Sequence, residues 1–116
     1  MIMSLHTELA SGRWHTLSLA DQLGNMGSEV SRALRAKQQM NELRMMSALD
    51  RALELCDLTI ADPKHRSRLK ELCRIREVVC DFFLGGNTYQ STDTSLNRYF
   101  MQFAMASRRK QSDYSA

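Results

Sequence analysis

The residues most able to do chemistry form a cationic run directly after the only proline of the chain, Pro63. Six Lys or Arg residues and a single acid, Glu71, lie between Lys64 and Arg76. Asp62 followed by Pro63 is typical of a helix start, in which Asp62 is the N-cap and Pro63 the first helical residue. Cations near that end oppose the helix dipole and cost roughly a few tenths of a kcal/mol each. The run therefore indicates a surface that binds an anion outside the chain.

Helical spacing sorts the run into two rows, and a second cationic cluster lies near the C-terminus. Arg66, Lys70 and Arg74 share one face, while Lys64 and Arg68 form a shorter row beside it. Such a surface suits the phosphate backbone of DNA or RNA, or an acidic protein. The candidate nucleic-acid- or anion-binding residues are Lys64, Arg66, Arg68, Lys70, Arg74, Arg108, Arg109 and Lys110.

The alternative interpretation of this run is a solvated helix face, neutralised by acids on neighbouring helices such as Glu54, Asp57 or Asp62. Aromatic side chains that stack on bases are scarce nearby, because Tyr89 is expected at the far end of the same helix, about 30 Å away. Contact with nucleic acid is therefore expected to involve the backbone and to be sensitive to salt.

Metal, cofactor and catalytic chemistry are not predicted. The three histidines are dispersed and no Glu-x-x-His pair occurs, which argues against a di-iron bundle. No Ser or Cys lies in a recognised nucleophile motif. The cysteines form no CxxC pair and lie within apolar helical stripes, so buried thiols are expected at Cys56, Cys73 and Cys80. We expect a protein that is not an enzyme.

The composition fits one globular domain. The 116 residues are 43% hydrophobic and 25% charged, with a formal net charge of +3. Three cysteines without a pairing pattern indicate a reducing compartment. No secretory signal and no apolar stretch near 18 residues occur, so we expect a cytoplasmic protein without a membrane partner.

The first predicted helix starts at Ser18, with Asp21 completing an approximate capping box. Its apolar residues recur at steps of three and four, which predicts a core-facing stripe. Gly24 and Gly27 lie beside this stripe, and we expect an aromatic ring, from Trp14 or the last helix, to pack against one of them. The alternative is that the glycines kink or break the helix. The stripe comprises Leu19, Leu23, Met26, Val30 and Leu34.

Three further helices are predicted, over residues 41–61, from Pro63 to about Leu84, and from the polar loop after residue 87 to about Arg109. Gly85-Gly86-Asn87 is a strong helix stop. Matched lengths and short connections predict an all-α, up-down-up-down four-helix bundle with a short N-terminal arm. The expected division is an arm over residues 1–16 anchored by Trp14, the bundle over 17–110, and a frayed tail over 111–116.

Three segments resemble small uncharacterised bacterial helical-bundle proteins: Asn25–Ala33, Arg51–Asp62 and Asn97–Ala104. In architecture alone, the chain is similar to S23-type four-helix bundles, which include accessory proteins of diversity-generating retroelements. Those proteins are basic, oligomeric and associated with nucleic acid and reverse transcriptase. The resemblance implies an oligomeric, nucleic-acid-associated bundle, and no residue role is carried over from it.

We therefore expect a non-enzymatic accessory or adaptor subunit, a homo-oligomer that presents its basic face to nucleic acid or to an acidic partner. The alternative is a purely structural protein–protein module without nucleic-acid binding. It would use the last helix or the methionine-rich positions as its interface, because methionine surfaces repack readily.

Overall fold

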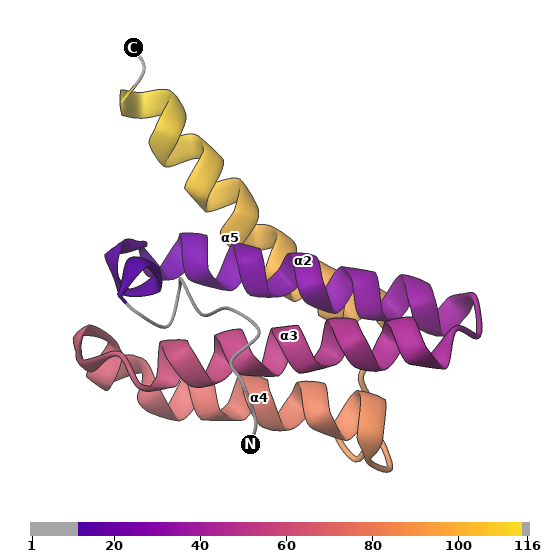
Figure 1. Ribbon diagram of the computed structural model, residues 1–116. Helices are drawn as coiled ribbons and strands as arrows, with labels where there is room; N and C mark the ends of the chain where they lie inside the picture. The colour runs from indigo at the N-terminus through magenta and orange to yellow at the C-terminus, as the bar shows by residue number, and fades with distance from the viewer. Residues whose placement is uncertain (1–11, 115–116) are drawn as a thin grey trace.

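The structure is a computed structural model that describes residues 12–114, with side chains through Arg109. Within this range the chain is helical and contains no strand. The elements are a 3-10 turn η1 (Arg13–Thr16), α2 (Leu19–Gln38), α3 (Glu42–Ile60), a 3-10 segment η2 (Pro63–Arg68), α4 (Leu69–Leu84) and α5 (Asp93–Tyr114). Figure 1 shows the four α-helices alternating in direction, which confirms the predicted all-α, up-down-up-down bundle.

Side-chain caps define the starts of α2 and α3. The Ser18 hydroxyl accepts the Asp21 N–H at 3.1 Å, and the Asn41 side chain accepts the Arg44 N–H at the same distance. The cap at Ser18 lies where the sequence predicts it, and Asn41, predicted as the first residue of its helix, is the N-cap instead. In both cases a short polar side chain satisfies a backbone donor that has no partner inside the helix.

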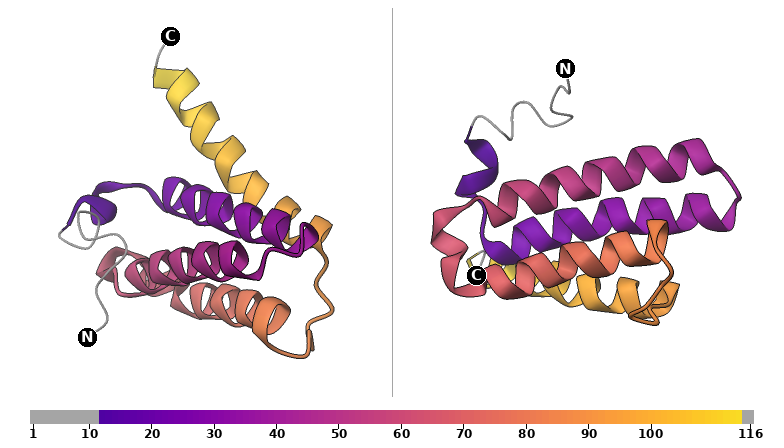
Figure 2. Two further views of the ribbon diagram at one scale, coloured as in Figure 1. Left: turned by 45° about the vertical axis from the view of Figure 1, so that its right-hand side comes forward. Right: turned by 90° about the horizontal axis from the view of Figure 1, so that it is seen from below.

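The core is centred on α2, which packs against α3 on one side and α5 on the other, while α4 packs against α3 (Figures 1 and 2). Leu23, Met26, Val30 and Leu34 of the predicted stripe are buried. They belong to one apolar cluster with residues of the other helices, among them Leu49, Leu55, Leu72, Val79 and Phe100. Burial of this shared apolar surface holds the helices together.

Two glycines allow α5 to approach α2 closely. A Cβ on Gly27 would lie 2.4 Å from Phe100 Cβ, and one on Gly24 would lie 3.4 Å from Ala104 Cα. The expected aromatic ring against a glycine is therefore Phe100 of the last helix. The alternative that the glycines break the helix is wrong, since α2 runs without interruption from Leu19 to Gln38.

The C-terminal half of α5 leaves the bundle at an angle to α2 (Figures 1 and 2). The helix continues to Tyr114, past the boundary at residue 110 that the sequence suggests. As a result, the end of α5 projects from the body of the molecule.

Trp14 anchors the segment before α2 to the body of the bundle, as predicted. Its ring is 1% exposed, and its Nε1 donates to Thr59 Oγ1 at 3.0 Å. Gln22 Nε2 donates to the Trp14 carbonyl at 2.9 Å. The rest of the predicted arm, residues 1–11, lies outside the described residues.

The prediction of one helix from Pro63 to Leu84 is wrong at its start. Asp62 is the N-cap, accepting the Lys64 N–H at 3.1 Å, but Pro63–Arg68 is a 3-10 segment and α4 begins at Leu69. His65 has non-helical dihedral angles, φ −104° and ψ 19°. Its side chain is buried, and its Nε2 lies 2.7 Å from Gln22 Oε1, so a tertiary hydrogen bond accompanies the break in the helix.

The cysteines differ in exposure. Cys56 is buried, and burial, with Asp57 nearby, raises its pKa to about 12. Cys80 is half-buried, but Cys73 is exposed, so the expectation of a buried thiol is wrong at Cys73. Cys73 lies one turn after Leu69, which is also exposed, so this part of α4 faces solvent.

Candidate nucleic-acid interface

The predicted cationic residues at the start of the third helix, Lys64, Arg66, Arg68, Lys70 and Arg74, are called here the helix-start patch. Lys64 is used inside the molecule. Its Nζ donates to the carbonyl oxygens of His15 and, at 2.9 Å, Leu17, and lies 3.5 Å from Asp62 Oδ2. This lysine therefore ties the segment before α2 to η2.

Arg68 and Arg74 also have partners within the chain. Arg68 Nη2 lies 2.8 Å from Glu71 Oε2, and the Arg74 guanidinium lies 5.6 Å from the centre of the Tyr89 ring. Only Arg66 and Lys70 of the patch have exposed side chains for which residues 12–109 show no hydrogen bond, ion pair or cation–π contact. Three of the five cations of the patch therefore contact other parts of the chain, and two face solvent.

Tyr89 lies closer to the helix-start patch than the sequence predicts. The Asp81 carboxylate accepts the N–H groups of Thr88 and Tyr89, at 2.8 and 3.0 Å, and so turns the loop after α4 back along the helix. These bonds, chiefly the one from Tyr89, hold the pKa of Asp81 below its ordinary value. Tyr89 therefore lies beside Arg74 rather than far from the patch, and the prediction about its position is wrong.

Below the patch lies a buried polar network. Asp62 is 5% exposed. Burial alone would raise the pKa of its carboxyl, but the hydrogen bonds from the Lys64 N–H and from His15 outweigh this effect and bring the pKa below its ordinary value. The pKa of His65 is lowered by burial, which Asp62 only partly opposes. These two groups fix the start of η2 and are covered by the chain.

A second cationic surface lies along α2, where two grooves adjoin. The groove between α2 and α5 has a volume of about 360 Å³, and the groove between α2 and α3 about 340 Å³. Arg32 and Arg35 line both. We call the arginines of these two grooves the arginine face: Arg32, Arg35, Arg44, Arg51 and Arg108.

One carboxylate holds two of these arginines. Glu29 is 8% exposed, and its Oε1 lies 2.8 Å from Arg32 Nη1 while its Oε2 lies 3.1 Å from Arg51 Nε. No acid lines either groove within the described residues. Glu29 pairs with Arg32 and Arg51 only, and Arg108 also lines a neighbouring groove that contains Asp21. The two grooves of the arginine face are therefore cationic, with the nearby acids at their margins.

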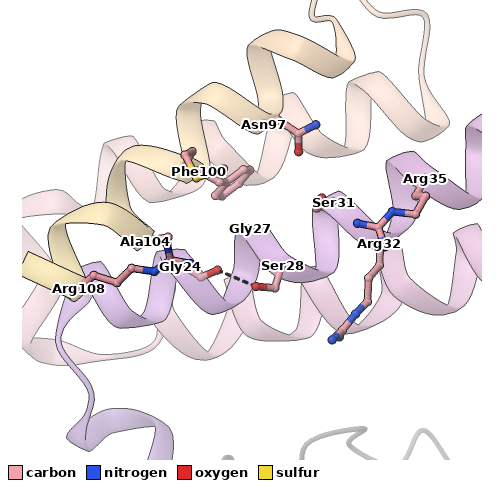
Figure 3. Close-up of a pocket in the computed structure, with 11 residues that line it drawn as sticks. Gly24, Gly27, Ser28, Ser31, Arg32, Arg35, Asn97, Phe100, Ala104 and Arg108 are labelled. Carbon is pink, nitrogen blue, oxygen red and sulfur yellow. Dashed lines mark hydrogen bonds between the residues drawn. The ribbon is translucent and has the colours of Figure 1, made fainter. Parts of the chain in front are cut away.

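The groove between α2 and α5 runs along small and polar residues (Figure 3). In that view Arg108 and Arg35 lie at its two ends, with Gly24, Gly27 and Ser31 between them. Eleven residues separate Gly24 from Arg35 along α2, which corresponds to about 16 Å of helix. The charges are therefore spread along an elongated surface rather than gathered at a point.

Of the C-terminal cations predicted as site residues, Arg108 belongs to the arginine face and Arg109 is exposed on α5. The side chain of Lys110 lies outside the described residues. The arginines of α2 and α3 were missed, because Glu29 and Arg32 look like ordinary charges of an exposed helix. The available signal was the absence of any other acid between Gln22 and Gln38.

Within residues 12–109, no group of three His, Cys, Asp or Glu side chains could hold a metal ion. None of the described helices combines the length and apolar character that crossing a bilayer requires. No family model, curated protein or solved structure matches the chain.

Proposed function

We propose that the protein is a non-enzymatic nucleic-acid-binding module that contacts the phosphate backbone through its arginine face. The observation that carries this proposal is that five arginines from three helices line two adjoining grooves that no acid lines within the described residues. A surface of this charge attracts polyanions and raises their rate of association.

The residue type supports phosphate as the ligand. The guanidinium group is planar and always charged, and its donors match phosphate oxygens in pairs. Arg35 and Arg108 have no ion pair among the described residues, and Arg32 keeps further donors after binding Glu29. Donors therefore remain for a ligand without breaking the internal contacts.

The helix-start patch supports the same function less well. Lys64, Arg68 and Arg74 already bind carbonyl groups, a carboxylate and an aromatic ring. A ligand would have to replace these contacts. Arg66 and Lys70 lack such partners and serve as the matched control for the arginine face.

The test measures binding of fluorescently labelled DNA and RNA by anisotropy at 50 and 200 mM salt. With about four phosphates neutralised, affinity should fall on the order of a hundredfold over that range. The variant R35A/R108A should bind at least about tenfold more weakly than the native protein. The control R66A/K70A removes the same two charges and should change affinity less than about threefold.

Circular dichroism and thermal unfolding establish that both variants remain folded. No salt-sensitive binding by the native protein would overturn the proposal. An equal loss in the two double variants would show that net charge alone matters and would remove the arginine face as the site.

A second candidate function, a protein-interaction module, has its own observation. A groove of about 280 Å³ between α4 and α5 is lined mostly by apolar side chains, among them Ile75, Val78 and Leu96. On α5, Met101 and Met105 are 53% and 52% exposed. Light scattering that detects a defined homo-oligomer, without salt-dependent nucleic-acid binding, would favour this candidate. A monomer that binds nucleic acid would exclude it as the main function.

A further inference from the structure

The outermost row of α2 has an unusual composition. Its residues recur at steps of three and four, and every one of them is exposed. They lie on the opposite side of the helix from the buried apolar stripe. We call this row the α2 ridge: Asn25, Ser28, Arg32, Arg35 and Gln39.

From Asn25 onward the α2 ridge contains no acid and no apolar side chain, unlike the exposed surfaces of α3 and α4, whereas one turn earlier the same face contains Asp21. The exposed residues of α3 include Glu42, Asp50 and Asp57, and those of α4 include Glu77. An ordinary solvated helix face mixes both signs of charge, as α3 and α4 do. The ridge instead combines arginine with neutral hydrogen-bonding groups. Asn25 and Ser28 donate to main-chain carbonyls one turn earlier, and their side-chain oxygens remain as acceptors.

These side chains are the types that read base edges in the major groove of DNA. Arginine pairs with guanine, asparagine and glutamine pair with adenine, and serine bonds to either. The major groove of B-form DNA is about 12 Å wide and admits one α-helix. The 20 residues of α2 are long enough to follow that groove over its full width.

The two grooves of the arginine face flank the ridge. Arg44 and Arg51 lie on the α3 side, and Arg108 lies on the α5 side. A helix seated in a major groove has one phosphate backbone on each side. Arginines on both flanks therefore match a duplex better than a single strand.

The lack of exposed rings also argues against a single strand. Phe100 is the one aromatic residue that lines either groove within the described residues, and it is 4% exposed. Proteins that bind single strands stack the bases on accessible aromatic side chains. Duplex RNA is excluded by shape, because its deep and narrow major groove does not admit side chains.

We infer, on the basis of the proposed function, that the ligand is double-stranded DNA and that the α2 ridge lies in its major groove. Arg44 and Arg51 then contact one phosphate backbone and Arg108 the other. The ridge supplies the contacts that depend on base sequence.

A competition experiment tests this assignment on the full chain. Three probes of the same sequence, about two helical turns long, are compared by anisotropy at equal salt: duplex DNA, single-stranded DNA and duplex RNA. Duplex DNA should bind at least tenfold more tightly than the other two. Glucosylated cytosines, which fill the major groove with a bulky group, should weaken binding to duplex DNA by a similar factor.

A matched pair of variants locates the contact. S28E and S67E each place one new carboxylate at an exposed serine, on the ridge and on η2 respectively. S28E should lose at least tenfold in affinity for duplex DNA, and S67E less than threefold. Equal losses would overturn the placement of α2 in the groove.

The possible failures are distinct. Binding of single-stranded DNA or of duplex RNA that equals or exceeds that of duplex DNA overturns the duplex assignment. No effect of the glucosylated cytosines overturns the placement of α2 in the major groove. Either result leaves the arginine face as a backbone-binding site. Absence of binding to all three probes overturns the proposed function as well.

Discussion

The helix-start patch and the arginine face each contain five cationic residues, but the fold uses them differently. In the helix-start patch, Lys64 donates to main-chain carbonyls and Arg68 pairs with Glu71. On the arginine face, one carboxylate, Glu29, orients Arg32 and Arg51, while Arg35 and Arg108 keep their donors for solvent or a ligand. The patch is therefore used mainly inside the molecule, whereas the arginine face keeps two guanidinium groups without an ion pair among the described residues.

The difference shows that charge density along the sequence does not measure charge that is available at the surface. The helix-start patch is continuous in sequence, so it stands out at once. The arginine face is assembled from α2, α3 and α5 and becomes visible only when these helices pack together. Availability depends on which partners the fold brings to each cation.

The largest effect is expected from Gly27→Ala, which disturbs the contact that joins α2 to α5. The new Cβ would lie 2.4 Å from Phe100 Cβ. Overpacking outweighs the gain in helix propensity, so the free energy of unfolding should fall by about 2 kcal/mol. Denaturant unfolding measures this change, and affinity for nucleic acid should fall with it.

Gly24→Ala is the control for that substitution, because its Cβ would lie 3.4 Å from Ala104 Cα, an ordinary contact. Its stability should stay within about 0.5 kcal/mol of the native value or rise. Equal destabilisation by both substitutions would contradict the account of how α5 is seated.

Glu29→Gln separates positioning from net charge. The substitution leaves Arg32 and Arg51 without their shared carboxylate, so it should cost about 1–2 kcal/mol of stability. Although it raises the net charge by one, affinity for nucleic acid should fall several-fold, because the two guanidinium groups lose their orientation. Tighter binding by this variant in the anisotropy assay would show that charge alone governs the arginine face.

Lys64→Ala should destabilise the protein by about 1 kcal/mol, because the carbonyls of His15 and Leu17 lose a charged donor. Arg66→Ala, its neighbour without such contacts, should stay within about 0.5 kcal/mol of the native value. Thermal unfolding measures both. If Arg66→Ala were less stable than Lys64→Ala, Arg66 and not Lys64 would be the cation that stabilises the fold.

The smallest effect is a dependence of stability on pH that originates below the helix-start patch. Burial lowers the pKa of His65. The negative charge of Asp62 partly opposes this shift, and the positive charges nearby add to it: Lys64, Arg68 and His15. The unfolded chain therefore binds a proton near the ordinary pKa of 6.5 while the folded chain does not, so stability should fall as the pH is lowered through 6.5. The lowered pKa of Asp62 adds a separate loss below its ordinary value of 3.8.

Comparing melting temperatures at about pH 7.5 and 5.5 tests this dependence. His65→Gln keeps a neutral donor for Gln22, so its melting temperature should fall less over that range than that of the native protein. The other histidines are common to both proteins and act as the internal control. An identical fall in the two proteins would exclude His65 as the source.

Local signals in the sequence predict most of the fold. The caps at Ser18, Asn41 and Asp62 form because each side chain reaches a nearby backbone N–H. The apolar stripe of α2 and the ring against Gly27 follow from helical spacing and from the need to bury the stripe. The caps and the stripe depend on residues two to four positions apart, whereas the partner of Gly27 is fixed only when α5 packs against α2.

The features that sequence reasoning missed depend on distant residues. The break at His65 accompanies a hydrogen bond to Gln22, 43 positions earlier. The return of Tyr89 depends on Asp81 accepting two N–H groups of the following loop. The arginine face requires the contact of α2 with both α3 and α5, which no local pattern contains.

The most direct test of the central claim is a titration of the isotope-labelled protein with duplex DNA, followed by amide chemical shifts in NMR. If α2 lies in the major groove, shifts should concentrate on residues 25–38 of α2, on 44–51 of α3 and on 97–109 of α5. Shifts that concentrate on residues 64–74 and leave α2 unchanged would contradict it.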